Sequence, residues 1–255
     1  MSTSAEAAHP GMGEAGTGQA GTGFRGVVAV DGPSGSGKSS VCRAVARQLG
    51  LRYLDTGSMY RAVTWAALDR GTDLEDKVAV AALCRTLVLD VATDPAAPGI
   101  AVDGVDVTGA IRQSRISESV SSIATNLDVR ADLIARQRAL IGEEKGTGVV
   151  VEGRDITTVV APDADLRLLL IADENARIAR RAREVHGTDD AAALAATHAQ
   201  VATRDARDST VVDFLAAADG VIEVDTSALD FEQVVAVVLG LVAQAREQAL
   251  SGKTR

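Results

Sequence analysis

Aromatic residues are scarce in this chain: phenylalanine, tyrosine and tryptophan together make up 2% of its 255 residues. A platform of stacked aromatic rings for single-stranded nucleic acid is therefore not expected. The net charge of -9 at pH 7 gives no long-range attraction to a polyanion, so only a local basic cluster could bind one. Cysteine is equally sparse. Cys42 and Cys84 have no metal-ligand spacing, and we interpret both as reduced core thiols.

Signals for export or membrane insertion are also missing. No Lys or Arg precedes Arg25, no apolar segment follows the start, and no segment approaches the run of about 20 apolar residues that a membrane span needs. We therefore expect a cytoplasmic protein without a membrane partner. Residues 1–24 are rich in Gly, Ala, Ser and Thr and are predicted to form a disordered tail, because they bury too little apolar surface to offset the entropy of ordering.

Residues 25–255 show a regular alternation of short apolar runs and amphipathic segments, and we expect them to form one domain. The predicted strands cover residues 26–30, 52–54, 148–151, 166–171 and 221–224. Strands that alternate with helices predict an α/β fold with a five-stranded parallel sheet flanked by helices. In such a sheet, ligands bind beyond the carboxyl ends of the strands.

Two segments depart from this alternation. Residues 87–107 alternate in polarity around Asp103-Gly104, a hairpin signal, and predict an antiparallel insert that extends over about residues 85–125. Two helical stretches joined at Gly187 predict a hairpin that could move as a lid, over about residues 177–208.

The strongest motif is Gly-Pro-Ser-Gly-Ser-Gly-Lys-Ser at residues 32–39, which matches the P-loop pattern G-x-x-x-x-G-K-[ST]. Glycines let backbone N–H groups approach phosphates, and the helix that follows adds the positive end of its dipole. The lysine reaches the β- and γ-phosphates, and the hydroxyl of Ser39 is expected to bind Mg²⁺. The residues predicted to hold ATP are Gly32, Pro33, Ser34, Gly35, Ser36, Gly37, Lys38, Ser39 and Ser40. The motif alone does not identify an acceptor.

Three further clusters bear on the acceptor. Asp55-Thr-Gly-Ser-Met-Tyr-Arg61 follows the second predicted strand, and Glu152-Gly-Arg-Asp155 follows another. Taken singly, Asp55 or Thr56 reads as an ordinary helix cap, and an isolated Arg-Asp pair reads as structural. The third cluster consists of arginines, which form either a solvated basic face or a clamp on transferring phosphates. Its members are Arg177, Arg180, Arg181, Arg183, Arg204 and Arg207. Beside a P-loop, these clusters together indicate phosphoryl transfer.

The combined motifs resemble those of bacterial cytidylate kinases. The resemblance rests on residues 31–39, 54–61, 151–160, 177–181 and 204–209, which occur in the order of that family and span most of the chain after Arg25. The antiparallel segment also looks like the family's enlarged monophosphate-binding insert. The resemblance implies that ATP and CMP or dCMP are converted to ADP and CDP or dCDP, with Mg²⁺.

The resemblance also implies roles for individual residues. Lys38, Arg154, Arg180 and Arg181 would be catalytic, and Arg177 would contact ATP from the lid. Ser121 would lie near cytosine, Arg130 at the acceptor phosphate, and Asp208 at the sugar. The complete set implied to bind the acceptor is Asp55, Thr56, Tyr60, Arg61, Ser121, Arg130, Arg154, Asp155, Arg204 and Asp208.

The chain departs from the family pattern at two places. Thr157 stands where the family commonly has a glycine, so the backbone there is not expected to need positive φ. Val211 stands where the family usually has a phosphate-binding arginine, and the segment after it is shorter. Arg207 is the candidate substitute for that arginine.

Two other functions remain open from the sequence. One is a P-loop kinase acting on AMP, GMP or a sugar, which the insert and the cluster at Asp55 disfavour. The other is a nucleotide-dependent switch. The sequence has no convincing Walker B run; the nearest is residues 168–173. We expect small-molecule partners only, no nucleic acid, and a monomer, because no large apolar stripe is left after the core is assigned.

Overall fold

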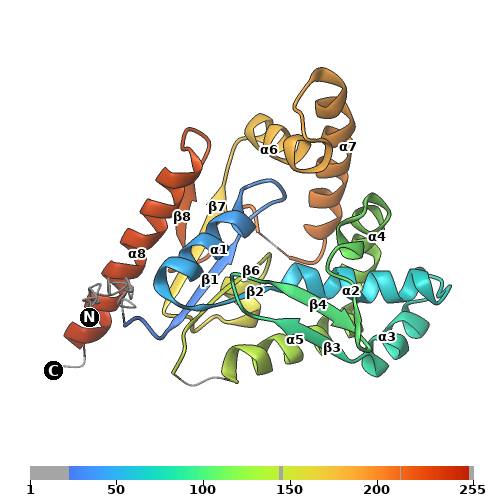
Figure 1. The fold of residues 1–255 in the computed structure, drawn as a ribbon, viewed down its shortest axis with the longest axis horizontal. Coiled ribbons are helices and arrows are strands. Elements are labelled where there is room, and N and C mark those ends of the chain that lie inside the picture. The colour runs from blue at the N-terminus through green and yellow to red at the C-terminus, as the bar shows by residue number, and fades with distance from the viewer. Residues whose placement is uncertain (1–22, 144–145, 213, 253–255) are drawn as a thin grey trace, which may run out of the picture.

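The computed structural model describes residues 23–143, 146–212 and 214–252, without the side chains of residues 184, 186, 199, 200 and 204 (Figure 1). The main sheet has five strands in the order β2-β6-β1-β7-β8, and each neighbouring pair is parallel. This confirms the predicted sheet, and each strand lies within one or two residues of its expected bounds. The strands are β1 (Val27–Asp31), β2 (Arg52–Asp55), β6 (Val149–Gly153), β7 (Leu166–Ile171) and β8 (Ile222–Asp225).

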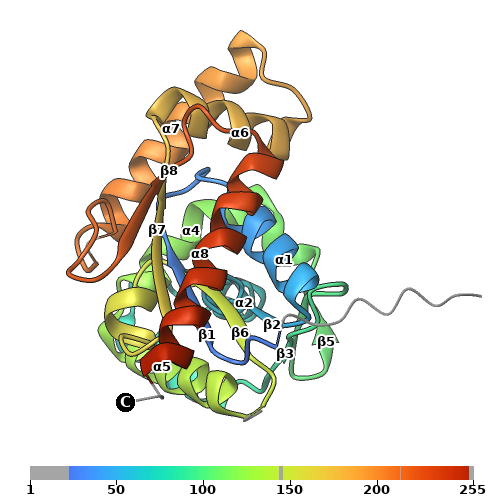
Figure 2. The same cartoon turned by 90° about the vertical axis from the view of Figure 1, so that its left-hand side faces the viewer.

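Helices cover both faces of this sheet because its strands are apolar on both sides. On one face, Val28 and Val30 of β1 pack into a core with α1 (Lys38–Leu49) and α8 (Phe231–Gly252). Figure 2 shows α8 lying across this face with α1 beside it. On the other face, Ala29 packs with residues of the short helical segment η2 (Ile156–Val160) and of α5 (Leu127–Gly142).

The structure changes two expectations about the ends of the domain. Phe24, which the sequence placed in the tail, is 8% exposed and belongs to the core around α1 and α8, whereas residues 1–22 lie outside the described residues. Helix α8 is also long and apolar enough to cross a membrane by length and composition, with a mean hydropathy of 1.3 over Phe231–Ser251. Val234, Val235 and Val238 of this helix are nevertheless buried in the same core.

A second core holds the predicted insert against α2 (Thr56–Asp69). Asp103 and Gly104 have φ of 49° and 80°, as the hairpin signal predicted for a type I′ turn, and β3, β4 and β5 form an antiparallel sheet. Trp65 of α2 packs against this core, and Cys84 is buried within it as a free thiol. The other elements here are α3 (Lys77–Thr86), β3 (Leu89–Ala92), β4 (Gly99–Val102), β5 (Val105–Asp106), η1 (Ala110–Arg112) and α4 (Ser114–Ala124).

The helical hairpin predicted as a lid is formed by α6 (Glu174–His186) and α7 (Ala191–Asp208). Gly187 ends α6 with φ 73°, a left-handed conformation that suits glycine. The two helices stand together beyond the end of the sheet, and α7 contacts α4 of the insert side (Figure 1). Whether this hairpin moves as a lid stays a prediction.

The second core supplies a test of the packing. Leu133 of α5 is 0% exposed, whereas Leu127 at the start of the same helix is 69% exposed. Leu133→Ala should lower the free energy of unfolding by about 2–5 kcal/mol, because it removes buried methyl groups and leaves a cavity. Leu127→Ala should change it by no more than about 0.5 kcal/mol. Urea titration followed by circular dichroism measures both, and equal losses would contradict this assignment of the core.

Candidate active site

The P-loop lies between β1 and α1, in the strand–loop–helix context that its sequence predicted. Helix α1 begins at Lys38 after Gly37, and no side chain among the described residues caps it, so the N–H groups of its first turn face the loop. Gly35 has φ 77°, and a Cβ atom there would lie 2.4 Å from the backbone oxygen of Arg177. Glycine is therefore required here both by conformation and by the close approach of α6. An uncapped helix end beside a glycine-rich turn suits a phosphate group.

Lys38 is held by the backbone of the loop itself. Its Nζ donates to the carbonyl oxygen of Gly32 at 2.6 Å and to that of Pro33 at 2.8 Å. These acceptors keep the ammonium group against the loop. Phosphate oxygens would have to compete with them for the same donor.

Glu152, at the end of β6, is a site residue to which sequence analysis gave no role. Its Oε2 accepts a hydrogen bond from Ser39 Oγ at 3.0 Å, and its Oε1 accepts one from the hydroxyl of Tyr53. Burial, and next the negative charge of Asp55, raise the pKa of Glu152 to about 7. The signal was present in the sequence: Val149 to Val151 form an apolar run that ends in this acid, next to the P-loop strand.

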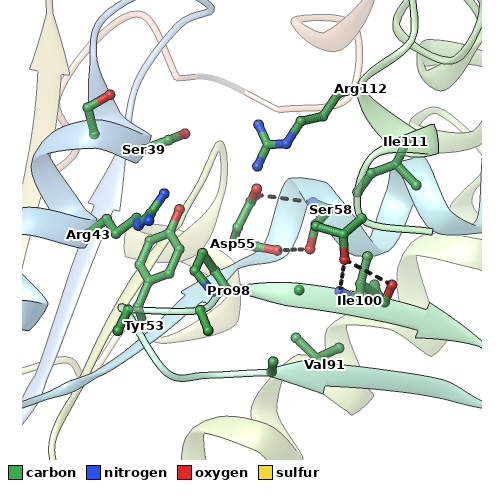
Figure 3. Close-up of a pocket in the computed structure, with 16 residues that line it drawn as sticks. Ser39, Arg43, Tyr53, Asp55, Ser58, Val91, Pro98, Ile100, Ile111 and Arg112 are labelled. Carbon is green, nitrogen blue, oxygen red and sulfur yellow. Dashed lines mark hydrogen bonds between the residues drawn. The ribbon is translucent and has the colours of Figure 1, made fainter. Parts of the chain in front are cut away.

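A cavity of about 490 Å³ opens beside Ser39 and Asp55, between α1 and the insert. Figure 3 shows Arg112 directed toward Asp55 across this cavity, with Arg43 on the opposite side. Arg43 is anchored through its Nε to the carbonyl oxygen of Pro95 at 2.9 Å. No sequence motif singled out either arginine, and Arg112 reaches this cavity only because of how the insert packs.

Asp55 also caps the N-terminus of α2, which is the ordinary structural role predicted for it from the sequence. Its carboxylate accepts from the N–H of Ser58 at 3.1 Å, so α2 begins at Thr56. This start places Thr56 and Tyr60 in the first turns of α2. Both line a second cavity, separate from the one that Arg112 lines.

This second cavity brings together most of the residues predicted to bind the acceptor. Arg130 of α5 contacts Asp155 at 2.5 Å, and Ser121 of α4 donates to Asp208 of α7 at 3.1 Å. Burial raises the pKa of Asp155, and the charge of Arg130 opposes that shift. Predicted residues that line the cavity are Thr56, Tyr60, Arg130, Arg154, Asp155 and Asp208.

Arg154 is the most constrained side chain of this cavity. Its Nε lies 2.8 Å from Asp208, its Nη2 lies 3.1 Å from Asp205, and its guanidinium lies 4.4 Å from the ring centre of Phe214. Its Nη1 is buried and has no hydrogen-bond partner among the residues that the structure describes. An unpaired buried donor is costly, so this nitrogen is suited to an anionic ligand.

The arginines predicted to act from the lid have different surroundings. Arg177 contacts Asp205 at 2.5 Å and donates to the carbonyl oxygen of Ser34 at 3.1 Å. Arg180 donates to the carbonyl oxygen of Thr226 at 2.6 Å, in the turn after β8. Arg181 lies on α6 and Arg61 on α2, both partly exposed. Arg204, which was also predicted to bind the acceptor, lies on α7, but its side chain is outside the described part of the structure.

The two departures from the family pattern have structural counterparts. Thr157 does not have positive φ, as expected, and its hydroxyl donates to the buried carboxylate of Asp31 at 2.6 Å. Val211 lines the acceptor cavity. Arg207 is exposed and is not among the residues lining that cavity, so it does not replace the missing arginine in this structure.

A P-loop at the carboxyl edge of a parallel sheet, next to a cavity of arginines and carboxylates, defines the class of P-loop kinases. Residues 28–244 match the family model described as cytidylate kinase, so the chain belongs to the cytidylate kinase family. It is 46% identical to a cytidylate kinase of Streptomyces griseus over 88% of this chain and 95% of that one. A cytidylate kinase of Streptomyces coelicolor is 47% identical over 86% and 94% of the two chains. The resemblance is confirmed.

The buried carboxyl of Glu152 makes a prediction about stability and pH. Its pKa is raised from 4.5 to about 7 in the folded protein, so between these values the folded state keeps a proton that the unfolded chain has lost. The contribution of Glu152 to the free energy of unfolding therefore falls as the pH rises from 4.5 to about 7. Glu152→Gln cannot ionise, so its free energy of unfolding relative to wild type should rise by about 3 kcal/mol between pH 4.5 and 8. Denaturant titrations in magnesium-free buffer measure this, and parallel pH profiles would contradict it.

Proposed function

We propose that this protein transfers the γ-phosphoryl group of ATP to CMP or dCMP, in pyrimidine nucleotide metabolism. The observation that carries the proposal is the acceptor cavity, where α2, α5, the residues directly after β6 and α7 each contribute a predicted acceptor residue. Chance clustering of these residues from distant parts of the chain is improbable. Membership of the cytidylate kinase family supports the same reaction.

The donor side fits ATP with Mg²⁺. The uncapped start of α1, the glycines of the loop and Lys38 supply donors for the triphosphate. Ser39, Glu152 and Asp55 offer the oxygen atoms that Mg²⁺ prefers, and one or two carboxylates suffice because the nucleotide's phosphates supply further ligands. When bound, Mg²⁺ would neutralise charge on the β- and γ-phosphates.

The acceptor side offers complementary groups for a cytidine nucleotide. Ser121 and Asp208 present a hydroxyl and a carboxylate for hydrogen bonds to the base and sugar. Arg130 and Arg154 present guanidinium groups for the phosphate, and Nη1 of Arg154, which has no hydrogen-bond partner in the described part of the chain, is available for one of its oxygens. Val211 forms an apolar part of the cavity wall at the position where the family usually has an arginine. Arg154 and Arg130 would therefore supply more of the positive charge that neutralises the acceptor phosphate than in a family member with that arginine.

Catalysis follows from positioning and charge neutralisation, because phosphoryl transfer to a phosphate oxygen needs little covalent help from the protein. Lys38 and Arg154 approach the site from the P-loop and from the end of β6, on the donor and acceptor sides. Arg177, Arg180 and Arg181 on α6 would neutralise the transferring group from the lid. Closure of α6 and α7 would exclude water, which otherwise competes with the acceptor.

The remaining expectations accompany this proposal. A kinase of small nucleotides needs neither nucleic acid nor a membrane partner, and we propose a cytoplasmic monomer. A kinase for AMP, GMP or a sugar, and a nucleotide-dependent switch, are the competing functions. Slow ATP hydrolysis that is indifferent to any acceptor would favour the switch.

The reaction class and the acceptor can be tested together. ADP release from ATP should be stimulated strongly by CMP or dCMP and weakly by UMP, AMP or GMP in a coupled assay. No stimulation by CMP or dCMP, in folded protein that binds ATP, would contradict the proposal. Lys38→Ala should lower kcat at least about 100-fold, because it removes a preorganised charge from the transferring phosphate. Lys77→Ala, on the exposed start of α3, is the matched control.

Asp208 tests the acceptor side separately. Asp208→Ala should raise the KM for CMP about 10- to 100-fold, because a hydrogen-bonding carboxylate is lost, and should change the KM for ATP by no more than about twofold. Arg207→Ala, one residue before it on the exposed face of α7, should leave the KM for CMP unchanged. Initial-rate kinetics with each substrate varied in turn measure these values. A larger effect on ATP than on CMP would place Asp208 on the donor side.

A further inference from the structure

Asp205 joins the donor and acceptor sides of the site through one carboxylate. It lies on α7 and is 8% exposed. Its Oδ1 accepts from the N–H of Ser34 at 3.2 Å and lies 3.1 Å from Nη2 of Arg154. Its Oδ2 lies 2.5 Å from Nη1 of Arg177. The P-loop, an arginine at the end of β6 and an arginine of α6 are therefore held by the same side chain.

The contact of α6 with the P-loop gives the donor side its link to Asp205. Arg177 donates to the carbonyl oxygen of Ser34 at 3.1 Å, and its own backbone lies so close to Gly35 that a Cβ atom would not fit. Phosphates bound in the loop would thus lie beside α6. Any ligand that holds α6 in place also holds Arg177 and the Asp205 carboxylate paired with it.

The acceptor side depends on α7 in the same way. Arg154 forms ion pairs with Asp205 and Asp208, which are three residues apart and so lie on one face of α7. With Phe214 against its guanidinium, the side chain has little freedom, and only Nη1 is left without a partner among the described residues. The orientation of Arg154 toward an acceptor phosphate therefore follows the position of α7.

A purely structural role for Asp205 explains these contacts less well. Buried ion pairs contribute little net stability, because desolvation offsets the attraction between the charges. The exposed pair of Asp189 and Arg183 already links α6 to the residues just before α7 at 2.9 Å, and among the described residues neither side chain forms a hydrogen bond or ion pair with the P-loop or Arg154. Holding the hairpin together does not require a carboxylate shared between the two sides of the site.

We propose that Asp205 is a positioning residue that couples the binding of ATP to the binding of CMP. The inference rests on the proposed function. ATP phosphates that hold α6 against the P-loop fix α7 and thereby orient Arg154 for the acceptor. An acceptor phosphate on Arg154 fixes α7 in turn, so each nucleotide tightens the binding of the other by the same factor.

The test measures the factor by which an ATP analogue tightens the binding of CMP. Isothermal titration calorimetry gives the Kd of CMP with and without saturating AMP-PNP and Mg²⁺, for wild type, Asp205→Asn and Asp189→Asn. In the wild type, AMP-PNP should tighten CMP binding by about fivefold or more. In Asp205→Asn, which keeps the shape but removes the charge, the factor should fall to about twofold or less. Asp189→Asn, the matched control on the exposed pair, should keep the wild-type factor.

The outcomes separate this inference from the proposed function. Wild-type protein that binds no CMP overturns both. Wild-type protein that binds CMP without coupling, or an Asp205→Asn variant that keeps the coupling, overturns the inference and leaves the function standing. A structural role alone would lower the melting temperature of Asp205→Asn without changing the factor. If that variant does not fold, Arg177→Gln replaces it. That change removes the guanidinium paired with Oδ2 of Asp205 and leaves Arg154 in place, so retained coupling in it overturns the inference.

Discussion

Pairing of buried charges at the carboxyl edge of the sheet is the constraint on which the site depends. An isolated charge in this environment would cost several kcal/mol, and three guanidinium groups of the site lie against carboxylates. Arg130 meets Asp155, Arg154 meets Asp205 and Asp208, and Arg177 meets Asp205. The partners come from different elements, so satisfying the charges also fixes how α5, α6 and α7 approach the strands. The arginines are thus oriented before any phosphate arrives, which lowers the cost of reorganisation on binding.

Local patterns in the sequence were sufficient to predict the scaffold of the site. Apolar runs such as residues 166–171 predict strands without reference to the rest of the chain, and the glycines of residues 32–37 predict a turn that approaches phosphates. The rule that carboxyl ends of parallel strands share an edge then placed Asp55 and Asp155 near the P-loop. The hairpin at Asp103-Gly104 was equally local. These predictions succeeded because each depends on a short stretch of chain.

Other features of the site depend on contacts that no short pattern encodes. Asp205 gains its partners only when α7 packs beside both the P-loop and β6, and Arg112 approaches Asp55 only through the packing of the insert. Phe214 lies in a segment that departs from the family, where the resemblance could not guide its placement. Glu152 is different: the apolar run that precedes it is visible in the sequence, but a Walker B run is expected to end in aspartate, so the strand beside β1 does not match that pattern. Arg207 was near Val211 in sequence, yet the turn of the helix directs it to solvent.

Trp65 has a practical consequence, because it is the single tryptophan of the chain and belongs to the core shared by α2 and the insert. Its helix also carries Tyr60 into the acceptor cavity. Fluorescence emission excited at the red edge of indole absorption therefore originates from one known position, in the part of the molecule formed by the insert and α2. The native chain carries a built-in optical reporter of that part, with no label to attach and no competing signal from α8 or the helical hairpin.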